Sequence, residues 1–159
     1  MHNDIPPAAV FEMICAKAYQ ERKCVDAGAM TYDVSVTRTD DGAVIKAKRK
    51  MPTVGFPSLL RRFVPSGVTS TETVTWGPAG ADGSRSAGLH VDFHGTPASM
   101  TGTIRIVGRT GGASVLVDAQ FKAHVPLLAG KVERIAAPLI LAVIDAEEQT
   151  AKEWVAGTK

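Results

Sequence analysis

The hydrophobic and polar positions of the chain change their spacing twice along its length. Near the N-terminus Val10, Phe11 and Ile14 recur at helical spacing, behind two prolines at positions 6 and 7 that a first helical turn tolerates. This pattern predicts a helix over residues 6–19 and a second, shorter helix over residues 20–25.

After Gly28 the spacing changes to two. Apolar or small residues alternate with polar ones, and threonines occupy every second position from 69 to 75, as on a pleated surface. Turn-forming sequences such as Asp40-Asp41-Gly42 and Gly111-Gly112 separate the alternating segments. The alternation predicts strands over residues 32–37, 43–51, 68–76, 85–93, 98–107 and 113–125.

Helical spacing returns in two later segments. Residues 56–65 predict one to two turns of helix with Leu59, Leu60 and Phe63 on the buried side. Residues 130–156 predict a final helix roughly 39 Å long with an apolar stripe on one side. We expect Pro138 to bend this helix, because proline removes one backbone hydrogen bond and crowds the preceding turn.

The order of these elements predicts an α+β fold. Strands in series joined by tight turns form an antiparallel sheet, and the helices then cover one face of it. A curved antiparallel sheet of six to seven strands around a long C-terminal helix leaves space between the two layers. No repeat or linker divides the chain, so a single domain over residues 1–159 is expected.

Composition and charge limit the possible partners. Hydrophobic residues make up 45% and charged residues 21% of the chain, which favours an ordinary globular protein over a disordered one. A net charge of +2 is too small to indicate a nucleic-acid partner, and the basic residues at 46–50 alternate as on a solvated strand face. The apolar run at 135–144 is half the length of a bilayer span.

The cysteines and the N-terminus indicate the compartment. Cys15 and Cys24 are not in a CxxC spacing, and the first residues have no secretory signal pattern. We therefore expect reduced thiols in a soluble, cytoplasmic protein.

Motifs for catalysis or metal binding are weak. His90, Asp92 and His94 form an HxDxH pattern on one strand face, but the apolar residues between them claim the buried side. The sequence has no phosphate-binding glycine loop and no GxSxG motif. No catalytic residue, metal or cofactor is predicted.

Four segments carry a resemblance to a known family. They are FPSLLRRFVP at 56–65, STETVTW at 70–76, GTPASMTGTIRI at 95–106 and VPLLAGKVER at 125–134. With them the chain resembles the helix-grip (SRPBCC) superfamily of START-like lipid-transfer domains and the birch-pollen allergen. Within it, the chain resembles an actinobacterial family of domains of unknown function. The resemblance implies a hydrophobic cavity between sheet and helix, used for lipids, polyketides or hormones and in some members for catalysis.

One feature departs from the family pattern. Members usually begin with a strand before the first helices, and only residues 1–5 could supply it here. A missing edge strand would expose backbone groups and favour a homodimer through that edge.

The predicted site is the cavity wall. By alternation, Arg49 and Glu72 share faces with inward apolar residues, so they could pair with each other or orient a polar head group. An exposed rim or an ordinary structural ion pair is the alternative. The predicted ligand-binding residues are Tyr32, Val34, Arg49, Leu59, Phe63, Glu72, Val74, Trp76, Val91, Phe93, Met100, Ile104, Val117, Phe121, Ile135, Leu139 and Val143.

Three functions fit this site. The first is a non-enzymatic carrier of a hydrophobic small molecule, such as a lipid or a polyketide-like compound. The second is an enzyme of the same fold, a cyclase, dehydratase or hydrolase, in which Tyr32, Arg49 and Glu72 converge in the cavity. The third is an interaction or structural protein with a filled core. The size of the cavity separates the third from the first two.

Overall fold

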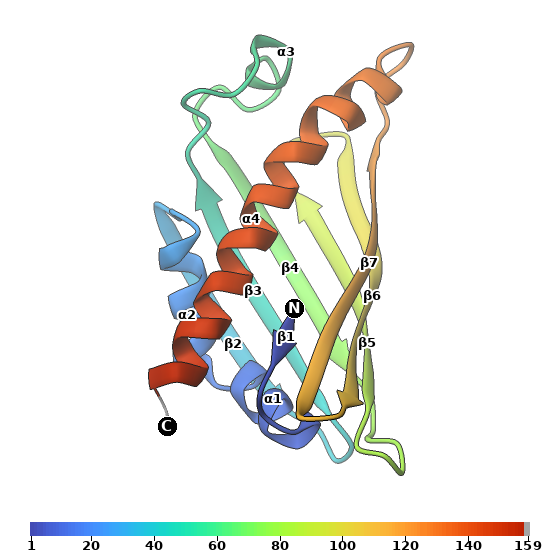
Figure 1. Cartoon of the computed structure of the whole chain (residues 1–159). Coiled ribbons are helices and arrows are strands. Elements are labelled where there is room, and N and C mark those ends of the chain that lie inside the picture. The colour runs from blue at the N-terminus through green and yellow to red at the C-terminus, as the bar shows by residue number, and fades with distance from the viewer. Residues whose placement is uncertain (158–159) are drawn as a thin grey trace.

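The computed structural model describes residues 1–157 and consists of one seven-stranded antiparallel sheet with a long C-terminal helix across it (Figure 1). This confirms the predicted α+β fold class and gives a helix-grip-like architecture. The strand order is β1-β7-β6-β5-β4-β3-β2. In chain order the elements are β1 (His2–Asn3), α1 (Pro7–Ile14), α2 (Lys17–Asp26), β2 (Thr31–Arg38), β3 (Ala43–Met51), α3 (Ser58–Arg61), β4 (Val68–Trp76), β5 (Arg85–Phe93), β6 (Ala98–Arg109), β7 (Gly112–Ala123) and α4 (Ala129–Gly157).

The first strand is present but very short. His2 pairs with Ser114 and Asn3 with Ala113, at the start of β7. Gly112 permits this contact, because a Cβ there would lie 1.9 Å from the carbonyl oxygen of Asn3. Beyond this pairing the outer edge of β7 has no strand partner among residues 1–157. The homodimer that a missing first strand would favour stays a prediction.

The N-terminal helices divide earlier than the sequence predicts. The expected helix over 6–19 ends at Ile14, and α2 begins at Lys17. The buried side chain of Gln20 stabilises this break, since its Nε2 donates a 2.6 Å hydrogen bond to the carbonyl of Ile14 at the end of α1. The inserted helix α3 is also shorter than expected and makes a single turn.

Besides a small cluster of Cys24, Val34 and Ala47 between α2 and the sheet, two hydrophobic cores hold the helices on the sheet. The larger one lies under α1 and the C-terminal end of α4, where Val10, Ile45, Ile106 and Ala151 are almost fully buried. The smaller one, at the opposite end, joins Leu60 of α3 with residues of β7 and the start of α4. The long helix α4 is therefore fixed at its two ends rather than along its whole length.

The long helix α4 continues through Pro138 and crosses the concave face of the sheet diagonally (Figure 1). Its buried residues fall into two groups, Val132 and Ala136 near its start and Thr150, Ala151 and Val155 near its end. No residue from 137 to 149 is buried, although many of them are apolar. The middle of α4 therefore spans the sheet without being packed tightly against it.

Candidate functional site

A cavity of about 1120 Å³ lies between the concave face of the sheet and the middle of α4. Its wall comes from β3 to β7, from the segment around α3, and from a continuous stretch of α4, and it is predominantly apolar and partly open to solvent. Val117 and Leu141 line this space and are 47% and 58% exposed. A volume of this size slightly exceeds the range of about 300–1,000 Å³ for ligand pockets and is far above that of packing voids.

Most residues predicted from alternation lie in this wall. Inward positions of β4 to β7 supply the sheet side, and α4 supplies the opposite side. The predicted residues found there are Arg49, Phe63, Glu72, Val74, Trp76, Val91, Phe93, Met100, Ile104, Val117, Phe121, Leu139 and Val143.

Two residues on β2, Tyr32 and Val34, were predicted to line the cavity, but both lie outside its wall. The helix α2 packs over β2 and fills this part of the concave face. Val34 is buried there against Cys24 and Ala47. Tyr32 is 43% exposed and does not line the cavity.

Leu59 and Ile135 also lie outside the cavity wall, contrary to the prediction. Both pack against the small core that Leu60 and Val132 form between α3 and the start of α4. Alternation and helical spacing identified their buried side correctly. They did not show that this part of the interior is filled.

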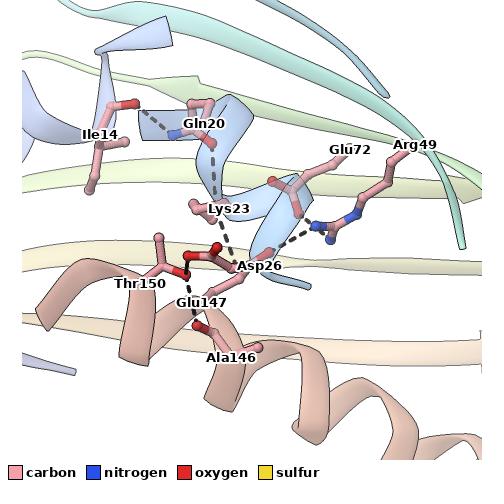
Figure 2. Close-up of polar contacts among 9 residues, drawn as sticks. All are labelled: Ile14, Gln20, Lys23, Asp26, Arg49, Glu72, Ala146, Glu147 and Thr150. Atoms are coloured by element: carbon pink, nitrogen blue, oxygen red, sulfur yellow. Dashed lines mark hydrogen bonds and ion pairs between the residues drawn. The ribbon is translucent and has the colours of Figure 1, made fainter. Parts of the chain in front are cut away.

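Four charged side chains form a connected cluster in the cavity wall, here called the charged quartet: Lys23, Arg49, Glu72 and Glu147 (Figure 2). Nη1 of Arg49 lies 3.1 Å from one carboxylate oxygen of Glu147, and Nζ of Lys23 lies 3.2 Å from the other. Nη2 of Arg49 lies 3.9 Å from a carboxylate oxygen of Glu72. Two cations and two anions thus balance, and each side chain is at most 20% exposed.

The charges of the quartet stabilise one another. Burial alone would raise the pKa of Glu147, but Lys23 and Arg49 outweigh it and the pKa is lowered. Burial would likewise lower the pKa of Lys23, but attraction to Glu147 and Glu72 raises it instead. The same balance of burial against these two carboxylates raises the pKa of Arg49. Lys23, Arg49 and Glu147 are therefore ionised around neutral pH.

A second layer of polar contacts holds the quartet in place. Oε1 of Gln20 accepts a 3.4 Å hydrogen bond from Lys23. The buried hydroxyl of Thr150 lies 2.9 Å from a carboxylate oxygen of Asp26, which joins α4 to the end of α2 (Figure 2). These contacts fix the backbones from which Lys23 and Glu147 project.

The prediction of an inward pair at Arg49 and Glu72 found half of this cluster. Lys23 and Glu147 were not among the predicted residues. The sequence spacing could have placed both on the buried sides of their helices. Glu147 follows Val143 of the apolar stripe of α4 by four residues, and Lys23 follows the buried Tyr19 by four. A charge that continues an apolar stripe indicates a buried partner.

The pKa shifts in the cavity wall all lead away from neutral pH. A general acid or base works best with a pKa near the operating pH. Instead, the pKa of Glu147 is lowered and those of Lys23 and Arg49 are raised, while burial raises the pKa of Tyr19 in the cavity wall. Since Tyr32 lies outside the cavity, the three groups of the predicted enzyme do not converge.

The remaining candidate residues lie outside the cavity. His90 and Asp92 are 3.3 Å apart on the exposed face of β5, and Nε2 of His94 lies 2.7 Å from the hydroxyl of Thr71. Within residues 1–157 no group of three His, Cys, Asp or Glu side chains could hold a metal ion. Lys46 and Lys48 are exposed.

Two further properties concern the cysteines and the helices. Cys15 and Cys24 are buried free thiols, and burial raises the pKa of both. In the described part of the chain no helix has the length and apolar character needed to cross a membrane.

Comparisons with known proteins place the chain in a family. No curated protein matches it. A family model matches residues 1–155, which is nearly the whole chain and includes every residue of the cavity wall. The chain therefore belongs to the family described as "Protein of unknown function (DUF2505)".

Proposed function

We propose that this protein is a carrier that binds a hydrophobic small molecule, such as a lipid or a polyketide-like compound, in the cavity under α4. We also propose that its family is part of the helix-grip (SRPBCC) superfamily. The observation that supports binding most is that an apolar space of about 1120 Å³ is maintained between two packed cores. Protein interiors normally close such spaces, because every lost contact costs free energy.

Burial of the ligand's apolar surface would drive binding. At about 25 cal/mol per Å², a ligand that buries about 300 Å² gains about 7 kcal/mol from this term alone, before the cost of immobilising it. Large apolar side chains on both sides of the cavity, such as Phe93, Phe121 and Leu139, would supply the contacts. The ligand is held by shape and apolar area rather than by a single strong polar contact.

The charged quartet would orient a polar group of the ligand. Its two positive and two negative side chains are already paired with one another, so it has no net charge to offer. A ligand group with one uncompensated charge would have to break these pairs, which is costly at a buried site. A neutral group with hydrogen-bonding atoms, or a zwitterionic one, fits better.

Native mass spectrometry of the protein purified from a lipid-rich host, followed by denaturing extraction, tests the proposal. We expect a reproducible non-covalent adduct that is released on denaturation. The mass of the released compound should identify the chemical class of the ligand. A protein with a clean apo mass from several hosts would contradict a tightly held ligand.

Leu139→Trp tests whether the ligand occupies the cavity. It places a larger side chain in the cavity wall from the unburied part of α4. We expect it to fold and to lose at least about 90% of the adduct. Val25→Trp, at a position 55% exposed on α2, is the control and should retain the adduct. Equal adducts in the two folded variants would show that the ligand lies elsewhere.

A further inference from the structure

We infer that one end of the molecule docks onto the surface of an anionic lipid bilayer. This end, here called the tip, consists of residues 52–67, which include α3, and residues 122–134, which join β7 to α4. Both segments extend beyond the same end of the sheet (Figure 1), and Leu60 and Val132 pack together between them. The tip is thus one surface built from two segments.

The tip exposes apolar side chains that the fold does not use. Val54 is 95% exposed, Leu127 is fully exposed and Leu128 is 37% exposed. Leu127 also has a φ of 63°, a left-handed backbone conformation that residues other than glycine adopt rarely. A leucine at this position contributes no packing to the protein itself. It lies where it can enter an apolar phase outside the protein.

The same two segments carry most of the tip's charge as cationic side chains. The two tip segments contain five Lys or Arg residues and one acidic residue, Glu133, which gives the tip a net charge of +4. The whole chain has a net charge of +2, so the remaining residues together have −2. The cations are Arg61, Arg62, Lys122, Lys131 and Arg134, and all five are exposed.

This combination fits a bilayer better than a protein partner. Exposed apolar side chains on two loops, with exposed cations on the same segments, can insert among lipid head groups while the cations meet anionic lipids. A stable protein interface needs a continuous packed patch of roughly 800 Å² on each side. The tip offers isolated apolar side chains instead.

The tip also lies where the cavity reaches the end of the molecule. Phe56 and Phe63 from one segment and Val125 from the other line the cavity and pack against the small core of the tip. A docked protein would therefore hold this end of its cavity against the lipid surface. Docking is a second property beside ligand binding, and the two can fail separately.

Vesicle flotation with the full chain tests the inference. The vesicles are phosphatidylcholine alone, or equal parts of phosphatidylcholine and phosphatidylglycerol. We expect binding to the anionic vesicles that is lost in about 1 M NaCl, where the screening length falls to about 3 Å. Arg61→Gln/Arg62→Gln should weaken binding by about 25-fold, since each cation near an anionic surface contributes roughly fivefold.

Matched variants locate the docking surface. Val54→Asp/Leu127→Asp should abolish detectable flotation, whereas Val25→Asp/Met30→Asp, at exposed apolar positions outside the two tip segments, should bind like the unmodified protein. Leu127→Gly should reduce binding without lowering the melting temperature, because glycine accepts the positive φ.

Three results would overturn the inference: no flotation of the folded protein with anionic vesicles, equal flotation with both vesicle types, or full flotation of folded Val54→Asp/Leu127→Asp. A protein that keeps its ligand adduct but does not float would overturn docking and leave the proposed function intact.

Discussion

At the scale of single residues, the ionised side chains of the quartet depend on one another. Glu147 is its centre, since it contacts both Arg49 and Lys23 at hydrogen-bond distance. Removing one charge from such a cluster leaves its partners with an uncompensated charge in a poorly solvated place. A single substitution in the quartet should therefore lower the free energy of unfolding strongly.

Glu147→Gln should lower the free energy of unfolding by about 2–3 kcal/mol, because Lys23 and Arg49 would then share the more distant Glu72 alone. Urea denaturation measures the change. The control is Glu153→Gln on the same helix, whose ion pair with Arg22 is about half exposed and should contribute at most about 1 kcal/mol. Equal losses in the two variants would show that the quartet is not a buried cluster.

The pH dependence of stability follows from the lowered pKa of Glu147. Its contribution is present above the ordinary value of 4.5 and is lost as the pH falls through the lower folded-state pKa. Lys23 has a raised pKa, so its contribution persists up to at least its ordinary value of 10.5. The stability difference between the unmodified protein and Glu147→Gln should therefore be constant from about pH 6 to 9 and shrink below about pH 4. A difference that grows on acidification would contradict this assignment.

The sequence pattern predicted the cavity wall correctly on some strands and wrongly on another. Alternation along β4 to β7 placed residues such as Val91 and Ile104 correctly in the cavity wall, because a strand fixes the direction of each side chain. It failed for Tyr32 and Val34, because the position of α2 over β2 is a tertiary property that no local period contains. Whether an inward residue meets a cavity or a neighbouring helix is decided by packing.

At the scale of elements, α4 is tightly packed at its two ends and loosely packed in its middle. Val155 is 7% exposed in the larger core, whereas Val143 lies in the cavity wall and is not buried. The boundaries of β2 to β7 agree with the alternating pattern to within two residues, because the turns between these strands contain strong sequence signals. The break between α1 and α2 has no such signal, since it rests on the side chain of Gln20 folding back onto Ile14.

Substitutions of two valines test whether α4 is tightly packed only at its ends. Val155→Ala should destabilise the fold by about 2 kcal/mol, because it leaves a void in a packed core. Val143→Ala should cost about 0.5 kcal/mol or less, since its side chain already faces a void. Chemical denaturation of both variants measures the difference. Equal losses would mean that the middle of α4 is tightly packed and the cavity is filled.

At the scale of the whole molecule, the cavity links stability to occupancy. A ligand that binds only the folded chain stabilises it by RT ln(1 + [L]/Kd), about 2.7 kcal/mol when its free concentration is a hundred times Kd. Protein that is unfolded, extracted with organic solvent and refolded should therefore melt at a lower temperature than protein purified directly. Adding back the extract should restore the melting temperature. Identical melting curves before and after extraction would show that the purified protein had held no ligand.

Pro138 gives α4 a local dynamic property. It lies between Ile135 and Leu139, which both pack against the small core, and at the start of the part of α4 without buried residues. Because proline has no N–H, the carbonyl of Arg134 lacks its usual intrahelical donor, and the turn on either side can open at lower cost. Amide hydrogens from 139 to 147 should therefore exchange with deuterated solvent much faster than those from 150 to 155. An occupied cavity should slow the exchange of the first group while leaving the second unchanged.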